Sequence, residues 1–257
     1  MTTQHKARLR AMAMAFDVTL DGFSSEVAAR SAIDGFHNEL LRADDLFSLH
    51  RPDTPMARLA NGQATLADVP REVIEVLELC EHYRVATGGA FDAQRPDGVI
   101  DPTGIVKTWA VVRATKRLGG VPSWLVAASG DIVAHGGERR VGIADPRVKG
   151  DPAGSKVLDV VALGGEFAAV ATSGSAQVAD HIWDPVTGKP ARHFLQASVA
   201  GQDLVECDAW ATAICAGGGP VVEMAVAAGL EVLIVAGERS EGGFEAVSSA
   251  GWPSASL

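Results

Sequence analysis

Helix-like and strand-like patterns fall in separate stretches of this sequence. Apolar residues recur at helical spacing in three early stretches, at residues 26 to about 45, from Pro70 to just before Gly88-Gly89, and at 103–118. Short runs rich in Val and Ala, typical of strands, follow at 124–132, 140–144 and 165–171. Two more helices near 206–216 and 220–228, separated by Gly217-Gly218-Gly219, and a last strand at 231–236 complete the pattern.

This order favours one fold class. A doubly wound parallel sheet needs strands and helices that alternate one by one, and the pattern here lacks that alternation. We therefore expect an α+β fold with a largely antiparallel sheet layered with helices. A chain of 257 residues is long enough for one large domain or two intimately packed halves. No linker divides it, so we expect one domain over residues 1–257, with flexible ends over about the first 12 residues and from about residue 238.

The charge of the chain excludes one class of partner. There are 22 Lys and Arg against 32 Asp and Glu, a net charge of −10, and no run of basic residues. Binding of nucleic acid through phosphate neutralisation is therefore not expected. An anionic small ligand would need a nearby group that compensates its negative charge, such as a metal ion or a helix N-terminus.

Apolar segments are short throughout. No stretch approaches the roughly 18 apolar residues of a membrane helix, and the N-terminal residues lack the long apolar run of a signal peptide. We expect a cytoplasmic protein without membrane contact.

The three cysteines, Cys80, Cys207 and Cys215, are widely spaced and form no CxxC pair. Two of them lie in apolar helical surroundings. Buried core thiols are the preferred interpretation, with a disulfide or a thiolate metal site as alternatives.

Asp208 and Thr212 lie four residues apart in a predicted helix, so both side chains point from one helical face. A carboxylate and a hydroxyl are hard oxygen ligands that suit Mg²⁺. An aspartate near a helix start is also common as a cap or a solvated side chain that faces the helix dipole. The residues alone leave both interpretations open.

The segment DPTGIVK, residues 101–107, predicts a turn followed by a helix. Asp101 and Pro102 favour the turn, and Thr103 can cap the helix. Lys107 would then lie in about the first turn, where the helix dipole disfavours a cation unless an anion is close. An ordinary surface lysine is the alternative.

His181 lies just ahead of the turn at Asp184-Pro185. An imidazole can exchange a proton near neutral pH, or it can simply bond to a backbone carbonyl. The common signatures GxxxxGK[ST], GxGxxG, HExxH and GxSxG are missing from the sequence. A phosphate ligand would therefore be held by other means.

In combination and in this order, the segments resemble one family, the ApbE-type FAD:protein FMN transferases (flavin transferases). The resemblance runs from about Met14 to Ala236. Its motifs are FSLHRPDTPMARL (47–59), TGGAFDA (87–93), DPTGIVKTWAVVRA (101–114), ASGDI (128–132), VGIADP (141–146), ATSG (171–174), HIWDPVTGKPA (181–191) and CDAWATA (207–213). The resemblance implies an α+β fold of the ApbE/T-fold type.

The resemblance also implies the site residues. The metal ligands are the side chains of Asp208 and Thr212 and the main-chain carbonyl of Gly104. The catalytic candidates are His181, Asp208 and Lys107, with Lys107 near the flavin nucleotide's phosphates and His181 near the pyrophosphate. The residues expected to contact FAD are Met14, Phe91, Asp92, Asp101, Thr103, Lys107, Thr172, Ser173, Gly174 and His181.

The implied reaction is Mg²⁺-dependent transfer of the FMN moiety of FAD to a Thr or Ser hydroxyl of an acceptor flavoprotein, with release of AMP. If water enters instead, the same site is an FAD pyrophosphatase that gives FMN and AMP. The other alternative is an FAD-binding or storage protein with weak or no transfer. Convergence of Asp208, Thr212 and His181 on one pocket, and the release of AMP with or without an acceptor, distinguish these possibilities.

Two motifs depart from the family pattern. The family usually begins its first strand with Met-Gly-Thr, whereas Met14 is followed by Ala15-Phe16. The early motif normally ends Arg-Leu-Asn, whereas Ala60 here follows Arg58-Leu59. These changes are expected to affect FAD affinity and adenine-end recognition and to leave the helix that carries Asp208 unaffected.

Overall fold

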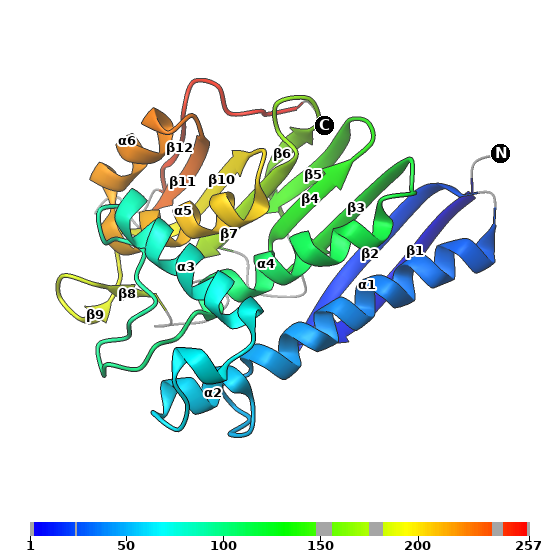
Figure 1. Ribbon diagram of the computed structural model, residues 1–257. Coiled ribbons are helices and arrows are strands. Elements are labelled where there is room, and N and C mark those ends of the chain that lie inside the picture. Colours follow the sequence, from blue (N-terminus) through cyan, green and yellow to red (C-terminus); the bar gives the residue numbers. More distant parts are fainter. Residues whose placement is uncertain (1–2, 24, 148–155, 175–181, 238–243, 256–257) are drawn as a thin grey trace. The chain divides into compact units, whose positions relative to one another are not determined.

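The chain forms two compact units in the computed structural model, which describes residues 3–23, 25–147, 156–174, 182–237 and 244–255 (Figure 1). Unit 1 consists of Met1–His82, Ala93–Ser129 and Ala134–Gly136. Unit 2 consists of Tyr83–Asp92, Gly130–Val133 and Gly137–Leu257. Two of the boundaries between the units fall within helix α3 (Arg71–Ala86) and strand β4 (Asp131–His135). The prediction of a single domain with closely packed halves stays a prediction.

Unit 1 contains three antiparallel strands covered by helices. Its strands are β1 (Thr3–Ala11), β2 (Met14–Phe23) and β3 (Ser123–Ala128), paired in the order β1-β2-β3. Its helices, besides the first part of α3, are α1 (Glu26–Phe47), α2 (Pro55–Ala60) and α4 (Thr103–Thr115), with 3₁₀ turns η1 (Leu66–Asp68) and η2 (Lys116–Leu118). Figure 1 shows α1 running along the face of β1 and β2.

The apolar spacing of α1 explains this packing. Phe36 and Leu40 lie four residues apart on one face, and both are fully buried, as is Phe16 of β2. Ser25 is the N-cap, and its hydroxyl accepts a hydrogen bond from the backbone N–H of Ala28 at 3.4 Å. The predicted helix over residues 26 to about 45 is therefore confirmed.

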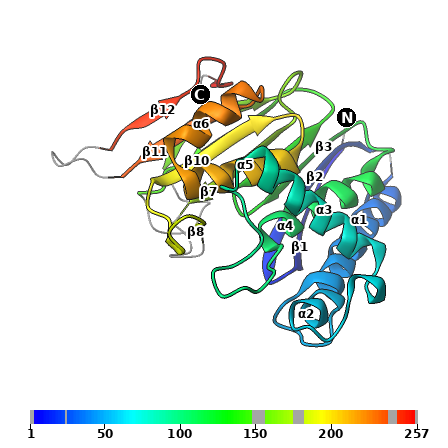
Figure 2. The same cartoon turned by 60° about the vertical axis from the view of Figure 1, so that its left-hand side comes forward.

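The main strands of unit 2 also pair antiparallel to one another. The first residues of β4 pair with β7 (Ala169–Gly174), and the order continues through β10 (Phe194–Gly201), β11 (Glu231–Ala236) and β12 (Ala246–Ser248). Separate pairs are formed by β5 (Arg139–Ala144) with β6 (Val157–Leu163) and by β8 (Trp183–Asp184) with β9 (Lys189–Pro190). Figure 2 shows helices α5 (Leu204–Gly217) and α6 (Gly219–Ala227) along this sheet.

These elements confirm the predicted α+β class with antiparallel strands. Helices α3, α4, α5 and α6 lie where the sequence predicts them, within a few residues. Gly218, with a φ of 75°, separates α5 from α6, so the glycine run is the helix break that was expected. None of the helices in the described residues is both long and apolar enough to cross a membrane.

Two strand predictions need correction, and strand β1 lies where the sequence pattern predicts none. The run 124–132 is two strands, because Ser129 and Gly130 both adopt positive φ angles of 50° and 95° and turn the chain between β3 and β4. The strand predicted at 165–171 is β7, which begins at Ala169 after a turn closed by bonds between Gly164 and Phe167. Residues 3–11 form β1, and Met14 begins the second strand of the sheet rather than the first. Flexibility of the two ends of the chain stays a prediction.

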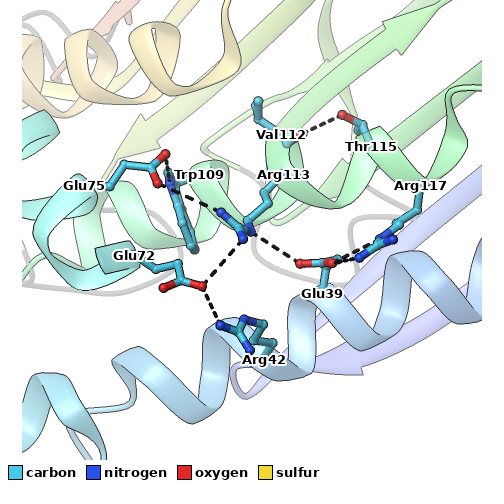
Figure 3. Close-up of polar contacts among 9 residues, drawn as sticks. All are labelled: Glu39, Arg42, Glu72, Glu75, Trp109, Val112, Arg113, Thr115 and Arg117. Carbon is cyan, nitrogen blue, oxygen red and sulfur yellow. Dashed lines mark hydrogen bonds and ion pairs between the residues drawn. The ribbon is translucent and has the colours of Figure 1, made fainter. Parts of the chain in front are cut away.

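An ion-pair network links the helices of unit 1 (Figure 3). Glu39 of α1 accepts hydrogen bonds from Nε of Arg117 at 3.0 Å and from Nε of Arg113 at 3.4 Å. Its side chain is only 13% exposed. The hydrogen bond from Arg117 is the main cause of a lowered pKa for Glu39.

A second carboxylate extends this network to α3. Glu72 accepts a hydrogen bond from Nη2 of Arg42 at 2.5 Å and lies 3.6 Å from Nη2 of Arg113. The neighbouring Glu75 accepts a bond from Nε1 of Trp109 at 3.2 Å. Arg113 therefore bridges carboxylates from α1 and α3, and it links both helices to α4.

We expect Glu39→Gln to destabilise the protein by about 1–2 kcal/mol at pH 7, because three charge-assisted hydrogen bonds from two partly exposed arginines, Arg113 and Arg117, are weakened. Since folding lowers the pKa of Glu39 below its ordinary value of 4.5, this stabilisation is complete above pH 4.5 and is lost as the pH falls below it. Chemical unfolding of the wild type and the variant between pH 3 and pH 7 measures the difference. The curves should converge at low pH, whereas Glu78→Gln, on an exposed position of α3, should follow the wild type throughout.

Candidate functional site

Asp208 lies in the second turn of α5 and is buried, with 3% of its surface exposed. The N-cap of this helix is Asp203, whose Oδ1 accepts hydrogen bonds from the backbone N–H groups of Val205 at 2.8 Å and Glu206 at 3.0 Å. The alternative that Asp208 is a capping or solvated residue is therefore wrong. A carboxylate is stable in such a buried position only where a cation or hydrogen-bond donors compensate its charge.

Thr212 lies one turn after Asp208 and faces the end of strand β7. Its Oγ1 is 3.1 Å from Oγ of Ser173, and either hydroxyl can donate in this bond. One turn further along α5, Sγ of Cys215 donates to the backbone carbonyl of Ser173 at 3.5 Å. The same face of α5 that carries Asp208 and Thr212 is thus joined to Ser173.

Thr172 is held from two sides. Its backbone N–H donates to Oδ1 of Asp131 at 3.1 Å, and its hydroxyl lies 2.9 Å from the hydroxyl of Ser198. Asp131 is 1% exposed and Ser198 is fully buried. Neither residue was among the predicted site residues. Asp131 lies within the ASGDI motif and could have been found there, whereas Ser198 lies on β10, a strand that the sequence pattern did not reveal.

Gly174, the last residue of β7, follows Thr172 and Ser173 and has no room for a side chain. A Cβ atom at this position would lie 2.4 Å from the backbone carbonyl oxygen of Leu195 on β10. Because the obstacle is backbone, β7 and β10 would have to separate to accept it.

We therefore expect Gly174→Ala to destabilise the protein by about 1–3 kcal/mol, the usual cost of overpacking. Urea unfolding of the full chain measures this difference. Gly219→Ala is a suitable control, because no atom lies within 4 Å of the added Cβ at the start of α6 and its stability should not fall. Equal stability of wild type and Gly174→Ala would contradict the close approach of the two strands.

Phe91 and Asp92 belong to unit 2 and follow the Thr87-Gly88-Gly89 turn. The backbone N–H of Phe91 donates to Oγ1 of Thr87 at 2.9 Å, and its ring meets the ring of Tyr83 edge-on, with centroids 6.5 Å apart. Phe91 is buried and Asp92 is exposed. Phe91 is thus part of the core, with Asp92 at the surface beside it.

The segment from Asp101 to Lys107 lies in unit 1. Oδ1 of Asp101 accepts hydrogen bonds from the backbone N–H of Thr103 at 3.1 Å and from its hydroxyl at 2.6 Å. The predicted turn is therefore present, but Pro102 is the N-cap and Thr103 is the first residue of α4. The prediction that Thr103 caps the helix is wrong, because its hydroxyl bonds back to Asp101. Gly104 and Lys107 follow in α4, and both are half-buried.

The predicted site residues therefore form two groups. Those in unit 1 are Met14, Asp101, Thr103, Gly104 and Lys107, and those in unit 2 are Phe91, Asp92, Thr172, Ser173, Gly174, Asp208 and Thr212. Convergence of the two groups stays a prediction. His181 lies outside the described residues.

The turn that follows His181 has the predicted form. Oδ1 of Asp184 accepts hydrogen bonds from the backbone N–H groups of Val186 at 2.8 Å and Thr187 at 3.3 Å, and Gly188 has a φ of 64°. The bond from Val186 is the main cause of a lowered pKa for Asp184. The carboxylate of Asp184 therefore stabilises the turn through these hydrogen bonds.

All three cysteines are buried and none of them forms a disulfide, which confirms the core-thiol interpretation. Burial raises the pKa of Cys215 to about 12 and that of Cys207 well above its ordinary value. Within the described ranges, no three His, Cys, Asp or Glu side chains gather as a metal site. A metal ion at Asp208 would have to be held by other oxygen donors, such as the Thr212 hydroxyl and a backbone carbonyl.

Comparison with known proteins identifies relatives of this chain. Residues 93–234, more than half of the chain, match the ApbE family. The chain is also similar to a solved structure of the flavin transferase ApbE from Vibrio cholerae, with 18% identity, a TM-score of 0.81, and coverage of 97% of this chain and 98% of that one. A comparison with curated proteins finds no match.

Two further solved structures are similar over nearly the whole chain. The ApbE protein from Thermotoga maritima has 21% identity and a TM-score of 0.79, with coverage of 95% of this chain and 96% of that one. The flavinyl transferase ApbE from Pseudomonas stutzeri, in its apo form, has 21% identity and a TM-score of 0.79, with coverage of 97% and 95%. At these identities the similarity establishes a shared fold.

Proposed function

The chain belongs to the ApbE family, and we propose that it is a flavin transferase that moves the FMN moiety of FAD to a Thr or Ser hydroxyl of an acceptor protein and releases AMP. One observation carries the proposal beyond family membership. The buried carboxylate of Asp208 shares a helical face with Thr212, whose hydroxyl contacts Ser173 in the ATSG motif. Ser173 and Thr212, which are 39 residues apart in the sequence, thus bring two motifs together in one polar corner of unit 2.

The donors in this corner fit Mg²⁺. The carboxylate of Asp208 and the hydroxyl of Thr212 are hard oxygen ligands, and neither is a nitrogen or sulfur donor that would favour a softer metal. Burial of the carboxylate is a cost that a bound cation would offset. The carbonyl of Gly104 is the third ligand that we propose. When bound, Mg²⁺ would offset the negative charge of the FAD pyrophosphate and of the AMP that leaves.

The remaining site residues would bind and orient FAD. Lys107 supplies the positive charge that an acidic chain needs beside a pyrophosphate. Thr172, Ser173 and Gly174 would form one wall, and their backbone is held in place by Asp131 and β10. The other contacts that we propose are Met14, Phe91, Asp92, Asp101 and Thr103.

The chain supplies two candidate bases for the transfer. The acceptor hydroxyl attacks the phosphorus of the FMN moiety, a new phosphoester bond forms, and the bond between that phosphorus and the oxygen bridging to AMP breaks. The proton of the hydroxyl passes to His181 or, as the alternative, to Asp208. AMP leaves with the electron pair of the broken bond and takes up a proton.

Incubation of the full chain with FAD, Mg²⁺ and candidate acceptor proteins tests the proposal. AMP is followed by chromatography and covalent flavin on the acceptor by mass spectrometry. AMP release that matches covalent flavin on a Thr or Ser supports transfer. AMP and FMN without an acceptor identify a pyrophosphatase, and tight FAD binding without AMP identifies a storage protein; either result contradicts the proposal.

A further inference from the structure

The hydrogen bond between Thr212 and Ser173 has a consequence for metal binding, if Thr212 is a ligand as proposed above. A threonine hydroxyl has one proton and two lone pairs. When a lone pair is directed at a cation, the O–H group needs an acceptor on another side. Oγ of Ser173, at 3.1 Å, can serve as that acceptor, because either hydroxyl can donate in this bond.

Ser173 is itself held firmly enough to act in this way. Its backbone pairs with Ala197 of β10, and its carbonyl accepts the thiol proton of Cys215 at 3.5 Å. Because burial raises the pKa of Cys215 to about 12, this thiol keeps its proton at neutral pH and remains a donor. The same α5 face thus contacts Ser173 twice, at Thr212 through the side chain and at Cys215 through the carbonyl.

A second contact fixes α5 further back along β7. Sγ of Cys207 lies 4.0 Å from the carbonyl oxygen of Ala169, at the start of the strand. The helix is therefore tied to β7 near both ends of the strand. Rotation of α5 that would turn Thr212 away from Ser173 would break these contacts.

We propose that Ser173 is a positioning residue for the metal site, which accepts the hydroxyl proton of Thr212 and so directs the lone pair of that oxygen at the cation. Residues around a metal that orient its ligands typically change metal affinity by about 10- to 100-fold when they are removed. This inference rests on the proposed metal site and extends it by one residue that does not itself bind the ion.

Titration of the full chain with Mn²⁺ alone, with free Mn²⁺ measured by electron paramagnetic resonance, tests the proposal without any turnover of FAD. Ser173→Ala should bind Mn²⁺ about 10-fold more weakly than the wild type. Ser173→Thr keeps a hydroxyl on the same strand and should retain most of the affinity. Thermal unfolding of each variant establishes that it is folded before the titration.

A double-mutant cycle separates positioning from a general effect on the fold. In a Thr212→Val background, which lacks the hydroxyl but keeps the side-chain shape, Ser173→Ala should cause no further loss. Ser198→Ala is the matched control, because it removes a hydroxyl bonded to the adjacent residue Thr172 and should leave Mn²⁺ affinity unchanged. Wild-type affinity in Ser173→Ala, or an equal loss in both backgrounds, would overturn the proposal.

A further variant distinguishes this inference from the proposed function. If Asp208→Asn loses Mn²⁺ affinity while Ser173→Ala does not, only the role of Ser173 is overturned. If Asp208→Asn binds Mn²⁺ as the wild type does, the metal is held elsewhere, and the metal site and the role of Ser173 both fail.

Discussion

Asp208→Asn is expected to lower the Mg²⁺-dependent release of AMP from FAD by about 10²–10³-fold, because it removes the only charged ligand proposed for the metal and keeps the size of the side chain. The fold should survive, since an amide is less costly to bury than a carboxylate. Mg²⁺ should raise the unfolding temperature of the wild type and have little effect on the variant, because a ligand stabilises only the form that binds it.

Asp203→Asn is the matched control for this prediction. It is the same substitution on the same helix, at the exposed N-cap, where asparagine caps as well as aspartate. Turnover should stay near that of the wild type. Retention of Mg²⁺-dependent turnover in Asp208→Asn would place the metal at other residues and would contradict the proposed site.

His181→Ala is expected to slow the chemical step by about 10²–10⁴-fold while FAD still binds, because it removes the group proposed to take the hydroxyl proton. Single-turnover measurement of AMP release gives the rate of the chemical step. Flavin fluorescence gives the affinity for FAD separately. His193→Gln serves as the control, since His193 is an exposed histidine that packs beside Gly218 and has no proposed role in the reaction.

His181→Gln distinguishes a catalytic histidine from a structural one. Glutamine keeps the capacity to hydrogen-bond but cannot act as a base at neutral pH. A folded variant that binds FAD and is inactive would support proton transfer by His181. An active variant would assign His181 to support of the turn at Asp184 and would leave Asp208 as the remaining candidate base.

Helices are the elements that the sequence predicts well in this protein. In α1, apolar residues such as Phe36 and Leu40 recur at helical spacing, and Ser25 supplies a cap. The break between α5 and α6 is also visible, because three glycines interrupt two apolar runs. These signals are local, so they can be read from neighbouring residues alone.

Strands that depend on distant partners were missed. In β1, charged residues such as Lys6 and Arg8 are exposed and alternate with half-buried ones, so the segment lacks the apolar run by which a strand is recognised. In β10, the residues from Ala197 to Ala200 are small and fully buried, and they pair with β7 and β11 on either side. Both strands are defined by partners that lie elsewhere in the sequence.

The candidate site also combines features that local sequence predicts with features that depend on distant partners. The sequence by itself determined the family motifs and the placement of Asp208 and Thr212 on one face of a helix, because i and i+4 positions share a face in any α-helix. Only the tertiary structure decided that Asp203 caps α5 while Asp208 is buried, and that Ser173 and Thr212 share a hydrogen bond. Burial and hydrogen bonds between strands and helices depend on how distant segments pack, and no spacing within one segment contains that information.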